Sequence, residues 1–180
     1  MKKISLALCL LFFTGAASVL AEEYKFVNSG WSAEEAVLSK ALAISARELE
    51  KKSDFRFDQA WELKVSLERL GLRGMAQYQP ETKIISFSSS IMSEMRINHK
   101  LPLYELDPAV VAGDDLWGPI IDHELGHLLM DQVSRQAGQG PWFTLEHFYS
   151  LTREEQLGLN ILSEGVGTYF GQINYPRREN

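Results

Sequence analysis

Two kinds of hydrophobic periodicity divide the chain into helices and strands. From Trp31 to Lys52, apolar residues recur every three or four positions, so that Val37, Leu42 and Leu49 share one side. Ser32 and Glu35 have the spacing of a capping box at the start of this segment. The pattern predicts an N-terminal scaffold helix with one buried face.

Strict alternation of apolar and polar residues follows this helix. Trp61 to Glu68 alternates without error, which predicts a half-buried strand. Met75 to Gln79 and Lys83 to Ser88 are shorter strand-like segments separated by a Pro-Glu-Thr turn, so we expect an antiparallel hairpin. Because Lys83 to Ser88 runs into a series of serines, we expect this strand to lie at the solvent-exposed edge of a small twisted sheet.

The C-terminal half has the helical period again. A short helix is expected near Ser90–Ile97, followed by a loop up to Val111 that contains Pro102 and Pro108. Asp114 or Asp115 can cap a long helix that ends near Gln136. A last helix should begin at Thr152, where Glu155 completes a second capping box, and end near Gly171. The order of elements predicts an α+β fold.

The N-terminus has the pattern of a secretory signal peptide. Lys2 and Lys3 precede the apolar run Ile4–Phe13, and Val19 and Ala21 give a small-x-small cleavage site. We therefore expect residues 1–21 to be a signal peptide and residues 22–180 to be one domain, exported to the bacterial periplasm or secreted. An uncleaved membrane anchor is the alternative, because the apolar stretch is nearly long enough to span a bilayer.

Composition narrows the function. The 180 residues contain 18 basic and 24 acidic side chains, and this acidic balance argues against a nucleic-acid partner. The one cysteine, Cys9, lies in the predicted signal peptide. A disulfide framework and a cysteine-based zinc cluster are therefore both excluded within one chain.

The long helix contains the sequence His123-Glu124-Leu125-Gly126-His127. Histidines four residues apart lie one turn above each other, so both imidazoles can reach one metal ion, and zinc suits such nitrogen ligands. Glu124 lies one step around the helix, in the position of a general base. The alternative is a surface histidine pair beside a solvated carboxylate.

A catalytic zinc ion needs a third protein ligand. Glu164 is the first candidate, because it is a lone carboxylate in the middle of the otherwise apolar last helix. Small residues around it, among them Ser163 and Gly167, would let this helix approach Gly126 closely. Glu146 and His147 are the competing ligands, and Glu164 could instead face solvent. We expect His99 to be an exposed loop residue.

The zinc helix and the glutamate helix together resemble the gluzincin branch of the zincin metallopeptidases. The resemblance implies a zincin-like fold with one Zn²⁺ ion held by His123, His127 and Glu164, and with Glu124 as the catalytic base that activates a zinc-bound water. It also implies that the edge strand of the hairpin, expected at Lys83–Ser88, binds the substrate backbone as an added strand. The partner would be a peptide or protein substrate, and the protein a monomer without a stable membrane anchor.

Two departures from the gluzincin pattern keep alternatives open. The interval from His127 to Glu164 is longer than in thermolysin-like enzymes, whose spacing would point near Glu146. The chain also stops soon after Glu164, which leaves Tyr169, Tyr175 and His147 as candidate oxyanion donors. A catalytically incompetent, zinc-retaining binding or regulatory protein is therefore the alternative, and a zinc-stabilised structural domain is a third possibility. Thr168 and Asp131 are candidate hydrogen-bond partners for the ligands.

Overall fold

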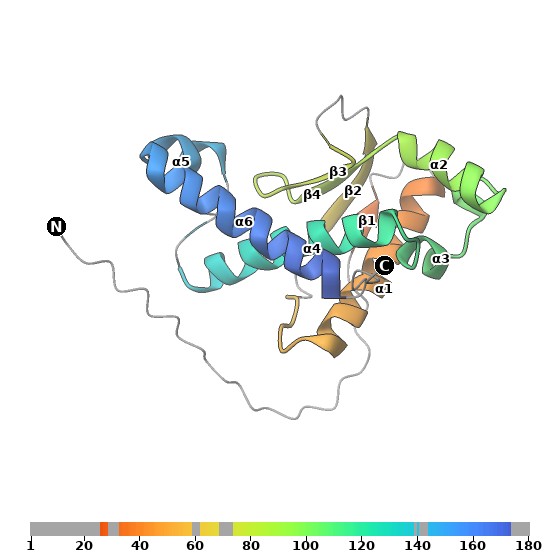
Figure 1. Ribbon diagram of the computed structural model, residues 1–180, viewed down its shortest axis with the longest axis horizontal. Coiled ribbons are helices and arrows are strands. Elements are labelled where there is room, and N and C mark those ends of the chain that lie inside the picture. Colours follow the sequence, from red (N-terminus) through yellow and green to blue (C-terminus); the bar gives the residue numbers. More distant parts are fainter. Residues whose placement is uncertain are drawn as a thin grey trace, which may run out of the picture.

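The computed structural model describes residues 26–28, 33–58, 62–68, 74–138, 140 and 144–173. The elements follow one another as strand β1 (Phe26–Asn28), helix α1 (Ala33–Lys52), strands β2 (Leu63–Glu68), β3 (Ala76–Gln79) and β4 (Ile84–Ser88), helix α2 (Ser90–His99), the 3-10 turn η1 (Leu103–Glu105), and helices α3 (Pro108–Ala112), α4 (Trp117–Gln136), α5 (Leu145–Ser150) and α6 (Arg153–Ile173) (Figure 1). The expected α+β class is therefore correct. The predicted signal peptide, residues 1–21, lies outside the described residues.

The strand order differs from the sequence-based expectation. The sheet has the order β1-β2-β4-β3, with β1, β2 and β4 parallel and β3 antiparallel to β4. The hairpin is confirmed, but the prediction that Lys83–Ser88 forms the edge is wrong: β4 is internal and β3 lies at the edge. Ser86 is fully buried because its hydroxyl has polar partners, Ser66 Oγ and Glu68 Oε1, each at 2.9 Å.

One hydrophobic core joins the sheet to α1 and α4. Helix α1 buries the predicted face, and Val65, Ile85 and Phe87 contribute fully buried side chains from β2 and β4. Trp117, at the first turn of α4, is fully buried, and its ring centroid lies 6.4 Å from that of Phe87. This packing fixes α4 against the sheet.

The segment between the hairpin and α4 is more ordered than expected. The short helix is confirmed, although it extends to His99, but the loop predicted after it contains η1 and α3. Pro108 starts α3 instead of breaking the chain, because its missing N–H costs nothing in a first turn. Asp107 caps this helix by accepting a hydrogen bond from the Ala109 N–H at 2.9 Å.

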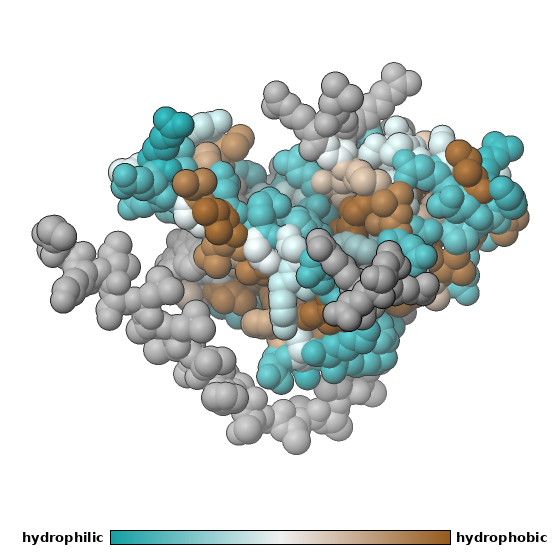
Figure 2. Space-filling view, viewed as in Figure 1, coloured by the Kyte–Doolittle hydropathy of each residue, from teal (hydrophilic) through white to brown (hydrophobic). Residues whose placement is uncertain are grey.

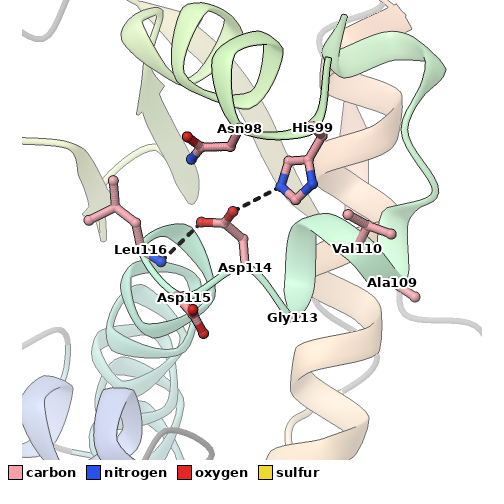
Figure 3. Close-up of a pocket in the computed structure, with 8 residues that line it drawn as sticks. All are labelled: Asn98, His99, Ala109, Val110, Gly113, Asp114, Asp115 and Leu116. Carbon is pink, nitrogen blue, oxygen red and sulfur yellow. Dashed lines mark hydrogen bonds and ion pairs between the residues drawn. The ribbon is translucent and has the colours of Figure 1, made fainter. Parts of the chain in front are cut away.

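Asp114 fixes the beginning of α4. Its Oδ1 accepts hydrogen bonds from the backbone N–H groups of Leu116 and Trp117, at 3.0 and 2.9 Å. Its Oδ2 lies 3.0 Å from His99 Nε2, and both residues line a pocket of about 530 Å³ (Figure 3). His99 is therefore a half-buried residue at the end of α2, and the expectation of an exposed loop histidine is wrong. Although partial burial opposes it, these hydrogen bonds hold the pKa of Asp114 below its usual value.

The C-terminal helix begins as predicted. The Glu155 N–H donates to Thr152 Oγ1 at 3.3 Å, and Glu155 Oε2 accepts from the Thr152 N–H at 2.9 Å, so the capping box is present. Helix α5, which was not predicted, precedes it. Among the described residues, no helix is both long and apolar enough to cross a membrane.

Replacing Asp114 with alanine should lower the free energy of unfolding by about 1 kcal/mol, since the first turn of α4 loses its cap. Urea denaturation at pH 7 measures this, with the exposed neighbour Asp115→Ala as the control. A carboxyl group with a lowered pKa stabilises the fold above its unfolded pKa and loses this effect as the pH falls through the folded pKa. The difference between wild type and Asp114→Ala should therefore narrow below pH 3.8, the ordinary value of this carboxyl group. If wild type and Asp114→Ala had the same free energy of unfolding at pH 7, Asp114 would not be a stabilising cap of α4.

Candidate metal site

Helices α4 and α6 cross at glycines. A Cβ added to Gly126 would lie 3.0 Å from Gly167 Cα, and one added to Gly171 would lie 2.8 Å from the Pro119 carbonyl oxygen. A Cβ added to Gly167 would lie 2.7, 2.8 and 2.9 Å from Cε1, Nε2 and Nδ1 of His123, so the imidazole lies against the glycine backbone. The predicted close approach of the two helices is confirmed.

This crossing brings the three predicted ligands together. His123 Nε2 and His127 Nε2 are 3.0 Å apart, as expected for neighbours one helical turn apart. Glu164 Oε2 lies 3.5 Å from His123 Nε2, and Glu164 Oε1 lies 3.9 Å from His127 Nε2. The Glu164 side chain is 70% exposed and yet lies beside both rings. Of the described residues, these form the group of histidine and acidic side chains whose geometry can hold a metal ion.

The separations fit a zinc ion. Two ligand atoms at normal zinc distances in a tetrahedral site lie about 3.3–3.6 Å apart. The two Nε2 atoms are 3.0 Å apart, and different oxygens of Glu164 lie 3.5 Å from His123 and 3.9 Å from His127. One ligand atom from each of the three residues lies within 4.8 Å of the other two, so small side-chain movements bring them to zinc-ligand distances. Burial, and secondarily the neighbouring His123, lowers the pKa of His127 to about 4, which favours the neutral imidazole that a metal ion requires.

Ser163 contacts one of the candidate ligands. Its Oγ lies 2.9 Å from His127 Nδ1, and the serine is buried. When His127 Nε2 presents its lone pair to the cluster, Nδ1–H donates this hydrogen bond, as in many metal-binding histidines. The sequence interpretation treated Ser163 only as a small packing residue. Its position directly before Glu164 was the available signal.

Asp131, proposed as a partner of the ligands, has another role. It is fully buried and accepts hydrogen bonds from Tyr78 Oη at 2.7 Å and Arg135 Nε at 2.9 Å. Arg135 also donates to the Pro80 carbonyl at 3.2 Å. Burial, and then the Asp131 charge, raises the pKa of Tyr78 well above its usual value. This cluster joins α4 to the edge strand.

Glu124 lies between the edge strand and a pocket. Its Oε2 accepts a hydrogen bond from the Tyr78 backbone N–H at 2.7 Å, and the residue is only 6% exposed. Burial raises the pKa of Glu124 to about 7, more than the Tyr78 N–H lowers it. Glu124 and His123 line an adjoining pocket of about 390 Å³ together with Met75, Ala76, Pro119, Ile120, Thr168, Gly171 and Gln172. The buried carboxylate therefore lies beside a cavity large enough for part of a ligand.

The remaining candidates lie outside the cluster of His123, His127 and Glu164. Glu146 and His147 are both in α5 and do not belong to the cluster of His123, His127 and Glu164. Tyr169 is 56% exposed and its ring packs edge-on against Phe170. Thr168 lines the pocket, and Tyr175 lies outside the described residues.

Comparison of the chain with protein-family models, with curated proteins and with solved structures finds no match. The chemistry of the His123, His127, Glu164 and Glu124 side chains is therefore what indicates a function.

We predict that Gly167→Ala weakens zinc binding at least tenfold, because the new methyl group would occupy the space of the His123 ring. Isothermal titration calorimetry measures the affinity. Gly165→Ala is the matched control, since a Cβ at Gly165 meets nothing within 4 Å. Equal affinity in the two variants would show that the ring does not need this contact.

We predict that Ser163→Ala lowers zinc affinity by 10- to 100-fold, the usual effect of losing a partner that orients a histidine ligand. Because alanine preserves the packing, the midpoint temperature of thermal unfolding of the metal-free protein should change little. Ser150→Ala, which removes an exposed hydroxyl bonded within α5, is the control. An unchanged affinity in Ser163→Ala would exclude the orienting role.

Proposed function

We propose that this protein is a zinc-dependent peptidase of a minimal gluzincin type, exported to the periplasm or the medium. The observation that carries the proposal is the convergence of His123, His127 and Glu164 at ligand spacing, with Glu124 buried beside them. These residues occupy the positions that the gluzincin motif assigns to the ligands and the catalytic base. The pocket next to Glu124 supports a reaction on a bound substrate rather than a purely structural metal site.

The chain supplies the ligands, the base and its orientation. When bound, zinc supplies Lewis acidity, which acidifies water and polarises a peptide carbonyl. Glu124 accepts the proton from the attacking water and later donates it to the leaving amine. The Tyr78 N–H holds one carboxylate oxygen, so that the base keeps a fixed direction. Ser163 keeps His127 in the tautomer that binds metal.

The substrate backbone binds along β3, not along β4 as the sequence suggested. The Tyr78 N–H donates to Glu124 and therefore points away from β4. Because backbone groups alternate in direction along an antiparallel strand, those of Ala76 also point outward, at the rim of the pocket. A peptide that adds to this edge gains main-chain hydrogen bonds with little demand on its sequence.

Export is part of the proposal and depends on the sequence of residues 1–21, and a monomeric state is proposed with it. The retained alternative is a peptidase-like binding protein that holds zinc without turnover. A quenched fluorescent peptide library, incubated with the zinc-loaded protein, separates the two functions. Cleavage that stops with a chelator and returns with zinc supports the peptidase.

We predict that Glu124→Gln binds zinc with nearly wild-type affinity and loses peptide hydrolysis by at least a thousandfold, because the amide can accept the Tyr78 N–H bond but cannot take a proton. Metal content and the rate of peptide cleavage are the two measurements. Glu146→Gln, on α5, is the matched control and should leave both unchanged. Persisting hydrolysis in the zinc-loaded Glu124→Gln protein would refute the assigned base.

A further inference from the structure

The N-terminal half of α6 projects from the core with apolar side chains uncovered. All the buried residues of this helix, Ser163, Gly167, Phe170 and Gly171, lie in its second half. In the first half, Leu157 and Ile161 are 60% and 65% exposed. Figure 2 shows a band of hydrophobic surface along this part of α6, near α5. Isolated apolar residues are common on protein surfaces. A row of exposed apolar residues that is continuous with the candidate metal site suggests a binding surface.

The exposed residues are in line with the metal site. Leu157, Ile161, Glu164 and Thr168 are separated by four, three and four positions, so they form one stripe along the helix. Glu164 belongs to the ligand cluster, and Thr168 lines the pocket beside His123 and Glu124. Leu157 and Ile161 therefore continue the same wall of the site toward the start of α6.

The edge strand lies near the end of α6 at its beginning, and the turn after it is tied to α5. Met75 and Ala76, at the beginning of β3, line the pocket together with Thr168 and Gly171 from the end of α6. At the other end of β3, the Glu81 carboxylate accepts a hydrogen bond from the Leu145 N–H at 2.7 Å, which ties the hairpin turn to α5. A chain that adds to β3 consequently runs beside the stripe.

We propose that Leu157 and Ile161 form a subsite for an apolar side chain of an extended polypeptide substrate. This inference rests on the proposed peptidase function and specifies its substrate. Leu157 and Ile161 precede Glu164 by seven and three residues, about 10 and 5 Å along a helix axis, and an extended chain covers these distances in about three and one residues. The preferred apolar residue therefore lies about one to three positions from the scissile bond. Because such side chains are buried in folded proteins, the substrates are unfolded or flexible polypeptide segments.

The test is a set of fluorogenic peptides in which one leucine is moved through each position from four before to four after the cleaved bond. Wild-type protein should cleave one peptide, with leucine about one to three residues from the bond on one side, about tenfold faster than its serine counterpart. The double variant Leu157→Ser/Ile161→Ser should lose this preference and cleave the leucine and serine peptides at similar rates. Leu162→Ser, an exposed apolar residue off the stripe, is the matched control and should retain it.

A binding measurement keeps the subsite testable without turnover. Fluorescence anisotropy with zinc-loaded Glu124→Gln protein should give tighter binding of the leucine peptide than of the serine peptide, and the two stripe substitutions should abolish the difference. If no peptide is cleaved but this difference appears, the peptidase proposal fails and the subsite stands. A preference that survives in the double variant, or no preference in either measurement, overturns the subsite. A wild-type dimer in analytical ultracentrifugation that dissociates in the double variant would also overturn it, since a second copy would then cover the stripe.

Discussion

The site depends on the contact between the His123 imidazole and the backbone of Gly167. Any side chain at Gly167 would displace the ring, and any at Gly126 would press on Gly167. Each glycine within a helix costs about 1 kcal/mol of helix propensity relative to alanine. Because these glycines have no side chains, α6 packs closely enough on α4 for Glu164, one turn before Gly167, to reach both histidines. Phe170, fully buried in the same interface, supplies hydrophobic contact that offsets part of this cost.

The opposite flank of α4 is held by the edge strand. Tyr78 makes two contacts with this helix, one from its backbone N–H to Glu124 and one from its hydroxyl to Asp131. Arg135 extends the same cluster to the Pro80 carbonyl. A buried polar network with satisfied partners fixes one arrangement, because breaking any bond leaves a desolvated polar group. The histidines therefore face α6 while Glu124 faces β3, and the two flanks converge on one pocket.

Helix α6 combines two functions along its length. Its second half packs on α4 and provides the small residues that the metal site needs. Its first half has no such packing, and its capping box at Thr152 and Glu155 supports the helix locally. A helix whose buried end is fixed can present an exposed end at a defined position. The same element thus supplies Glu164 to the candidate metal site and a wall to the proposed substrate groove.

Local patterns in the sequence were sufficient for the α+β class, the hairpin, the helices α1, α4 and α6, and the histidine pair, because helical period, helix caps and four-residue spacing are properties of contiguous residues. The expectation that Glu164 lies near this pair rested in addition on the small residues that let two distant helices approach each other. They were not sufficient for the strand order, for the Ser163–His127 bond or for the pairing of His99 with Asp114. The sequence predicts that a serine in β4 is exposed to solvent, because it does not show that Ser66 and Glu68 lie beside it. It predicts that His99 is a loop residue, because it does not show that α4 begins next to it. These features depend on which distant segments pack together. Whether a polar side chain can be buried at low cost depends on the hydrogen-bond partner that such a segment provides, and not on its neighbours in the sequence.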